Sequence, residues 1–209
     1  MPKPCLSLLV VLLLGGASNA LPETNLVPNP GFEQPAKSDG LPAGGWWLYQ
    51  GQGDTKATVD QTIFHTGKAS VKLQASTKAK SVLVSAPFAV APGDELRFEA
   101  WVRGKNLEPG QTQAHAGLAF RQADGKVFKR AYFPAESVSA AWSVISGVAL
   151  APDGATSAEV HLGYTNTPGI LWFDDVVATI TSPVSFSMTD GAKPWPGQQD
   201  ITQIGRAHV

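Results

Sequence analysis

Turn residues interrupt this chain at short, regular intervals, and the segments between them alternate apolar and polar side chains. The clearest turn signals are Pro92-Gly93-Asp94, Pro109-Gly110, Ala123-Asp124-Gly125, Pro152-Asp153-Gly154 and Pro168-Gly169. Glycine supplies the positive φ that tight turns need, and proline presets the corner. A chain broken this often has no room for long amphipathic helices. The pattern therefore predicts an all-β domain, an antiparallel β-sandwich or jelly roll.

The alternating segments between the turns are the expected strands, at 70–74, 82–88, 95–103, 114–121, 127–133, 142–150, 158–164 and 171–180. Because successive side chains of a strand point to opposite faces, each segment can be divided into two faces. The expected core side of 95–103 consists of Leu96, Phe98, Ala100 and Val102. Trp101 falls on the opposite side, among charged residues.

Composition and charge narrow the range of partners. The chain has 209 residues, 43% of them hydrophobic, and a formal net charge of −1. This length and apolar content suit one domain with extensions at either end. Lysine and arginine are scattered singly, so the sequence shows no basic patch for nucleic acid or for an anionic membrane. We expect neither as a partner.

The segment 1–20 has the features of a secretory signal peptide. Lys3 provides a positive start, an apolar run occupies 6–14, and the small residues Ser18 and Ala20 suit a signal peptidase. The apolar run is too short to anchor the chain across a bilayer. We therefore expect cleavage after Ala20 and secretion, to the extracellular space or the periplasm.

Cys5 is the only cysteine, and it precedes the apolar run rather than following it. This position does not support lipidation, which needs the cysteine at the cleavage point. Cys5 would leave with the signal peptide, so the mature chain would carry no disulfide and no cysteine metal ligand.

The strand pattern ends near residue 182. Pro183, Pro194 and Pro196 follow with little alternation, and we expect 183–209 to be a linker or the start of a truncated following domain. The segment 204–209 matches the in-frame translation of a common sequencing adapter. This match suggests an artefact in place of the native continuation.

Four short motifs follow one another in the chain: 25–33 (NLVPNPGFE), 65–73 (HTGKASVKL), 142–147 (WSVISG) and 171–176 (LWFDDV). In this order and spacing they resemble the CenC-like carbohydrate-binding modules of families 4 and 9, with family 22 as relatives. The resemblance covers about 21–182. It implies a galactose-binding-domain-like jelly roll that binds polysaccharide and is appended to a secreted glycoside hydrolase, whose catalytic domain would be missing from this chain.

The resemblance also implies a structural calcium ion. Glu33 and Asp174 would supply side-chain oxygens, and Gly31 and Lys68 would supply backbone carbonyls. Calcium takes six to eight hard oxygen ligands, and carboxylates and carbonyls are both of this kind. The alternative is that Glu33 and Asp174 are ordinary carboxylates of a turn and a strand end.

Sugar binding needs flat aromatic surfaces with polar groups beside them. Trp101 is the first candidate because its strand face carries charges; the alternative is a lone surface tryptophan or one covered by a hairpin. The polar candidates, provided that their strands share one sheet, are Arg103, His115, Arg121 and His161.

The position of the other aromatic residues in the chain indicates whether each belongs to a site or to the core. Trp46, Trp47 and Tyr49 follow a glycine-rich bend, and at least one of them is expected to rim a site, with Trp47 as the candidate. Trp142 and Trp172 stand at strand starts and are expected in the core.

The sequence offers no catalytic constellation. Asp174 and Asp175 alternate on one strand, so they are expected on opposite faces and could not flank one glycosidic bond. No nucleophile elbow, zinc motif or phosphate-binding loop is present. The favoured interpretation is a non-catalytic polysaccharide-binding module. The alternatives are a structural or adhesion sandwich without sugar binding and, third, an unrecognised enzyme.

Overall fold

The structure, a computed structural model, describes residues 23–36, 42–108, 114–135, 137–164 and 166–181. These residues form ten β-strands and no helix, so the all-β prediction is confirmed. In particular, nothing in the described ranges is a helix with the length and hydropathy to cross a bilayer. The expected signal peptide and the segment 183–209 lie outside the described residues.

The strands are, in chain order, β1 (Trp46–Gln52), β2 (Lys56–Asp60), β3 (Ser70–Ser85), β4 (Phe88–Ala89), β5 (Glu95–Lys105), β6 (Ala114–Arg121), β7 (Val127–Ala135), β8 (Ser143–Leu150), β9 (Ser157–Tyr164) and β10 (Thr167–Thr181). All of their pairings are antiparallel. The predicted segments 70–74 and 82–88 turn out to be mostly one strand, β3, because no glycine or proline interrupts 70–85.

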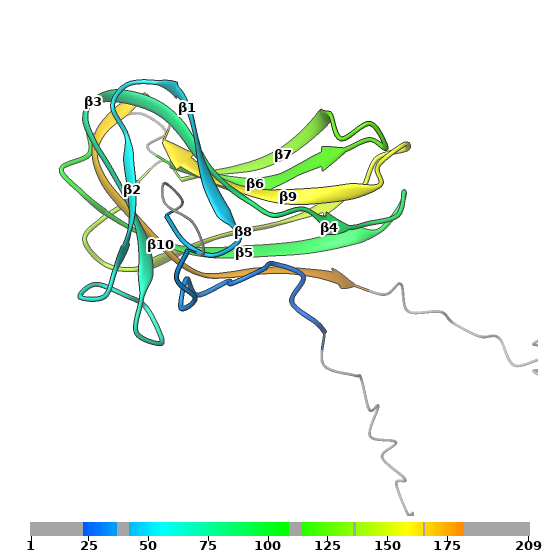
Figure 1. Cartoon of the computed structure of the whole chain (residues 1–209), viewed down its shortest axis with the longest axis horizontal. Helices are drawn as coiled ribbons and strands as arrows, with labels where there is room; N and C mark the ends of the chain where they lie inside the picture. Colours follow the sequence, from blue (N-terminus) through cyan, green and yellow to red (C-terminus); the bar gives the residue numbers. More distant parts are fainter. Residues whose placement is uncertain (1–22, 37–41, 109–113, 136, 165, 182–209) are drawn as a thin grey trace, which may run out of the picture.

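The strands form two layers packed face to face as a jelly-roll sandwich (Figure 1). The upper layer, as Figure 1 shows it, has the order β1, β3, β9, β6, β7, and the lower layer has the order β2, β3, β10, β5, β8. β3 belongs to both layers. Its first part, 70–79, pairs with β2 and β10, and its last part, 80–85, pairs with β1 and β9.

The core lies between the layers and confirms the predicted strand faces. The four residues assigned to the inner side of 95–103 are all fully buried. Tyr164, from β9, is also fully buried, and its hydroxyl lies 2.7 Å from the carbonyl oxygens of Leu73 and of Gly169, either of which can accept its proton. A polar group is tolerated in an apolar core when it is hydrogen-bonded in this way.

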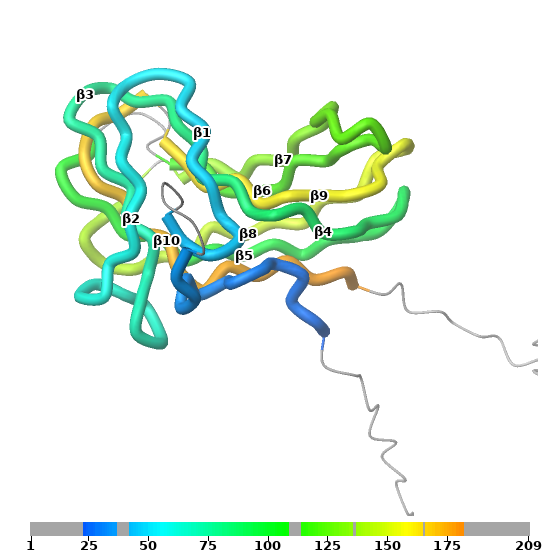
Figure 2. Tube along the Cα trace, viewed as in Figure 1, coloured from blue at the N-terminus to red at the C-terminus, as the bar shows by residue number. Residues whose placement is uncertain are grey.

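The motif 25–33 runs beside β10 (Figure 2, blue tube beside orange). The amide of Leu26 donates to the carbonyl of Ala178 at 2.9 Å, and the side-chain amide of Asn25 donates to the carbonyl of Val176 at 2.9 Å. The amide of Val176 in turn donates to the carbonyl of Pro30 at 3.0 Å. Two motifs from opposite ends of the domain are thereby joined.

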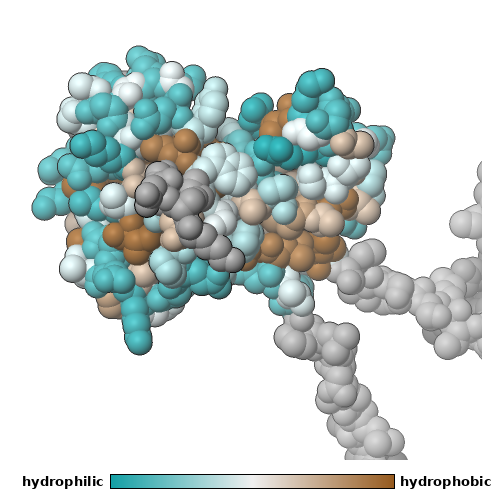
Figure 3. Space-filling view, in the orientation of Figure 1, coloured by the Kyte–Doolittle hydropathy of each residue, from teal (hydrophilic) through white to brown (hydrophobic). Residues whose placement is uncertain are grey.

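On the face that Figure 3 shows, apolar side chains gather in separate patches with hydrophilic residues between them. The exposed large apolar side chains include Val144, Val148 and Leu150 of strand β8, which lies at the end of the strand order. Their even spacing along β8 places all three on the outer face of this edge strand.

Candidate functional site

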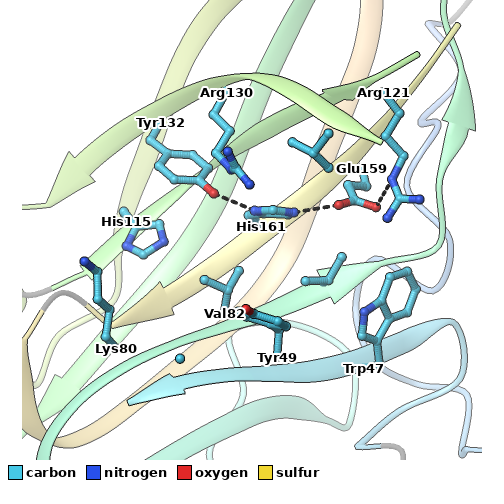
Figure 4. Close-up of a pocket in the computed structure, with 13 residues that line it drawn as sticks. Trp47, Tyr49, Lys80, Val82, His115, Arg121, Arg130, Tyr132, Glu159 and His161 are labelled. Atoms are coloured by element: carbon cyan, nitrogen blue, oxygen red, sulfur yellow. Dashed lines mark hydrogen bonds and ion pairs between the residues drawn. The ribbon is translucent and has the colours of Figure 1, made fainter. Parts of the chain in front are cut away.

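The outer face of the upper layer is hollowed into a groove with a volume of about 530 Å³. It crosses strands β1, β3, β9, β6 and β7 of that layer, and its side chains stand up from the sheet in Figure 4. The lining residues are Trp47, Tyr49 and Gly51 from β1; Lys80, Val82 and Val84 from β3; His115 and Arg121 from β6; Val127, Arg130 and Tyr132 from β7; and Glu159 and His161 from β9.

Two glycines stand next to groove residues on the central strands of the upper layer. Gly117, in the middle of β6, pairs with His161 on one side and with Tyr132 on the other. A Cβ atom at Gly117 would clash with the backbone carbonyl of Ala131, and one at Gly163 would clash with that of Ser81. No side chain therefore fits at these two places, which lie beside the groove residues His161, Tyr132 and His115.

Aromatic side chains stand at both edges of the groove. Trp47 and Tyr49 come from β1, at one edge of the upper layer, and Tyr132 comes from β7, at the other edge (Figure 4). Tyr49 is 65% exposed and Tyr132 is 36% exposed. Exposed tyrosine and tryptophan rings present large, rigid, flat surfaces to a ligand at a low cost in conformational entropy.

A chain of four polar side chains crosses the groove between these edges (Figure 4). The hydroxyl oxygen of Tyr132 lies 2.6 Å from His161 Nδ1, and His161 Nε2 lies 2.8 Å from Glu159 Oε1. Glu159 Oε2 forms an ion pair with Arg121 Nε at 2.7 Å. His161 and Glu159 are buried, with 6% and 2% exposed. Each member therefore fixes the next, and the polar surface of the groove is preorganised.

The surroundings shift the pKa values of these groups. Burial disfavours the charge of Glu159, but His161 and Arg121 more than offset this effect and hold the pKa of Glu159 below its usual value. Burial, together with the charges of His161 and Lys80, lowers the pKa of His115 to about 4. Near neutral pH, Glu159 is thus a carboxylate and His115 is uncharged.

The structure divides the predicted sugar-binding residues into two groups. His115, Arg121, His161 and Trp47 line the groove together. Trp101 and Arg103 lie on β5, in the lower layer, and do not join them. Trp46 points the other way from its neighbour: it is fully buried, and its Nε1 donates to the carbonyls of Pro28 and Asn29.

Several groove residues were not among the sequence candidates, namely Lys80, Arg130, Tyr132 and Glu159. The alternation of 158–164 already placed Glu159 and His161 on one face. What the sequence could not provide was the strand order, which puts β9 between β3 and β6. This order brings the faces of five strands into one surface.

Trp101 lies on the outer side of the lower layer, as its strand position predicted, but a loop covers it. The imidazole of His65 stacks on the indole with ring centroids 3.9 Å apart. Trp142 is the third member of this cluster, with its ring centroid 5.7 Å from that of His65. Trp142 is only half-buried, contrary to the core position expected for it, whereas Trp172 is 3% exposed.

Two of the four expected calcium ligands, the carboxylates of Glu33 and Asp174, bind backbone amides of the loop 65–69. Glu33 Oε1 accepts from the amides of Lys68 at 2.7 Å and Ala69 at 3.2 Å. Asp174 is fully buried, and its Oδ2 accepts from the amides of His65 at 2.7 Å and Thr66 at 3.3 Å. A Cβ atom at Gly31 would lie 3.8 Å from Asp174 Oδ1.

Burial raises the pKa of Asp174 to about 6, and the neighbouring charge of Asp175 adds to this effect. The described residues contain no cluster of three or more histidine, cysteine or acidic side chains with metal-binding geometry. A cation here would therefore need carbonyl oxygens beside the carboxylates. Such a mixed set of hard oxygens fits calcium in kind.

The expectation that Asp174 and Asp175 point to opposite faces is wrong. Asp175 Oδ2 lies 2.7 Å from His65 Nδ1, and its Oδ1 accepts from the Thr66 hydroxyl at 2.7 Å. The strict alternation fails because a bulge interrupts the pairing of β10 with β5 between Asp174 and Val177, and Asp175 has a φ of +45°. Both carboxylates consequently reach the same loop.

No model of a known protein family matches the sequence, and no curated protein matches it. Solved structures are similar in fold. Tailspike protein 4 of bacteriophage CBA120, in its enzymatically active domain, has a TM-score of 0.60 and 18% identity, over 75% of this chain and 21% of that chain. The chain thus spans about a fifth of the length of this tailspike.

Carbohydrate-binding modules of families 22, 61 and 4 also match. The xylan-binding family 22 module from Paenibacillus barcinonensis Xyn10C has a TM-score of 0.53 and 15% identity, over 73% of this chain and 92% of that chain. The family 61 module TmCBM61, in complex with β-1,4-galactotriose, has a TM-score of 0.53 and 14% identity, over 76% of this chain and 99% of that chain. At such identities the similarity establishes the β-sandwich fold of this class of module.

Proposed function

We propose that this protein is a carbohydrate-binding module that holds a polysaccharide chain in the groove of its upper layer. The observation that carries the proposal is the combination of aromatic rings at both edges with a fixed polar chain between them. Trp47, Tyr49 and Tyr132 offer flat faces to the apolar sides of pyranose rings, and the polar groups can meet the hydroxyls. The fold shared with xylan- and galactotriose-binding modules supports this assignment.

The wider role that we propose is that of a secreted accessory module of a glycoside hydrolase. The signal-like segment 1–20 supports export, and the sequence resemblance to CenC-like modules supports a catalytic domain in the same polypeptide. Such a module would raise the concentration of its enzyme at the polysaccharide without chemistry of its own. A structural calcium ion at Glu33, Asp174, Gly31 and Lys68 belongs to the same proposal, because it would tie the loop 65–69 to β10.

Affinity gel electrophoresis tests the binding function. The protein is run through native gels containing single soluble polysaccharides, neutral and charged, beside a gel without polysaccharide. We expect at least one polymer to retard the protein, and Trp47→Ala to reduce the retardation. Trp101→Ala is the matched control, because it removes a tryptophan outside the groove. Absence of retardation in every gel would favour a structural or adhesion sandwich instead.

A further inference from the structure

The groove carries a local excess of positive charge. Its lining contains three cationic side chains, Lys80, Arg121 and Arg130, and one carboxylate, Glu159. The whole chain has a formal net charge of −1, so the excess does not reflect the average composition. The carboxylate is also occupied, since one of its oxygens pairs with Arg121 and the other with His161. The groove therefore presents no unpaired carboxylate to a ligand.

Lys80 and Arg130 are the two cationic side chains of the groove that do not pair with Glu159. Among the described residues, neither forms an ion pair with a carboxylate, whereas Lys78, Arg97 and Lys126 each do. Both side chains are exposed, one on β3 and the other on β7 (Figure 4). Arg130 contacts the Tyr132 hydroxyl, and Lys80 lies near His115 in Figure 4. The two charges thus face the ligand space on either side of the central polar chain.

Cationic donors outnumber carboxylate acceptors in the lining of the groove. Lysine and arginine side chains donate and do not accept. Glu159 is the strongest acceptor in the lining, but its two carboxylate oxygens already interact with Arg121 and His161. The hydroxyls of a neutral chain could accept from these cations, but they carry no charge to match them. A ligand rich in acceptor oxygens, such as carboxylate or sulfate groups, fits this surface better.

From these observations we infer that the groove selects an anionic polysaccharide, with its acidic groups bound by Lys80 and Arg130 and its rings stacked on Trp47, Tyr49 and Tyr132. This inference rests on the proposed function and names the ligand class of that same groove. Arginine and lysine form charge-assisted hydrogen bonds with carboxylate and sulfate oxygens, and arginine can do so in a bidentate manner. A uronate ring keeps the apolar face that stacking needs while it adds one negative charge per residue.

The test compares polymers that differ in charge and share their backbone. Polygalacturonate and alginate are each compared with their carboxyl-reduced forms, and dextran sulfate is compared with dextran, in affinity gels and by isothermal titration. We expect a polyanion to bind, its neutral counterpart to bind about tenfold more weakly or worse, and added salt to weaken the binding. The carboxylate and sulfate arms identify which acidic group is recognised.

Variants locate the effect in the groove. The double variant Lys80→Gln/Arg130→Gln should lose about tenfold or more in affinity for the polyanion, and Lys80→Arg/Arg130→Lys should retain most of it. The matched control is Lys56→Gln/Lys129→Gln, which removes two exposed charges outside the groove. Thermal melting of each variant shows that the fold is kept.

Four results would overturn the inference. Equal binding of charged and reduced polymers, or binding of neutral polymers alone with loss in Trp47→Ala, would refute the charge selection and leave the proposed function standing. A loss in the Lys56/Lys129 control as large as that in the groove variant would show that binding follows overall charge. Binding of no polymer of either kind would remove the proposed function together with this inference.

Discussion

The imidazole of His65 lies parallel to the indole of Trp101, with an interplanar angle of 16° and a centroid separation of 3.9 Å. One face of this tryptophan is therefore covered by the protein itself. His65 is held in place by Asp175, whose Oδ2 lies 2.7 Å from His65 Nδ1. Trp101 thus anchors the loop 65–69, which also carries the backbone amides bound by Glu33 and Asp174.

Trp101→Ala should lower the stability of the fold and leave polysaccharide binding in the groove intact. The indole is half-buried and stacks with the loop, so its loss should cost about 1–3 kcal/mol of unfolding free energy. Urea unfolding and affinity gels of the same variant measure the two effects. A fully stable variant with lost binding would place the sugar site on the lower layer instead.

Trp47→Ala and Tyr49→Ala should show the reverse behaviour. Tyr49 is 65% exposed and Trp47 is half-buried, so little core packing is lost, and each fold should remain near its original stability. Binding should weaken by about 1–3 kcal/mol if the rings act as the dominant aromatic contacts of the groove. Isothermal titration with the polysaccharide that retards the protein most provides the measurement. Unchanged affinity in both variants would remove the aromatic edge of β1 from the binding surface.

Calcium should raise the melting temperature, because an ion that binds only the folded state stabilises it. Without the ion, the raised pKa of Asp174 means that its favourable contribution is present below the unfolded pKa near 4 and is lost as pH rises through about 6. Calcium needs the ionised carboxylate, so the gain in melting temperature should be larger at pH 8 than at pH 5.

Differential scanning calorimetry with calcium and with chelator, at both pH values, tests this expectation. Asp174→Ala should abolish the calcium effect, and Asp153→Ala, in an exposed turn, should keep it. An intact protein whose melting temperature ignores chelator at pH 8 would contradict the calcium proposal.

His115 should contribute to acid sensitivity. Its pKa is lowered to about 4 in the folded state, chiefly by burial, against a usual value of 6.5. The folded state therefore binds fewer protons, and stability should fall as pH drops from about 6.5 to about 4, by up to roughly 3 kcal/mol. His115→Gln should flatten this part of the pH profile in urea unfolding experiments. A profile with the same slope in the variant would show that other groups cause the loss.

The strand faces were predictable because alternation is a local property of the chain. The inner set of β5 and the outward position of Trp101 both follow from it. The stacking of His65 on Trp101 does not follow from alternation, because the covering loop comes from a distant part of the sequence. Asp175 shows a second limit, since a single bulge in β10 reverses the direction that a period of two assigns.

The groove was predictable only in part for a related reason. Alternation placed His115 and His161 away from the core, but their adjacency depends on β9 lying between β3 and β6. Tyr132 becomes a site residue only through the pairing of β7 with Gly117, a register that no local pattern reports. The need for glycine at positions 117 and 163 is likewise recognisable only once their neighbours across the strands are known.

The sharing of β3 by both layers has a mechanical consequence. The strand passes from the lower layer into the upper layer and is paired on both sides at 71–74, with β2 and β10, and again at 82–84, with β1 and β9. One strand therefore ties the two layers together, and a large relative movement would break the pairing at one of these two stretches. We therefore expect the groove to have its shape before a ligand binds. A polysaccharide would be selected by how well it fits this preformed groove, and not by a movement of the layers around it.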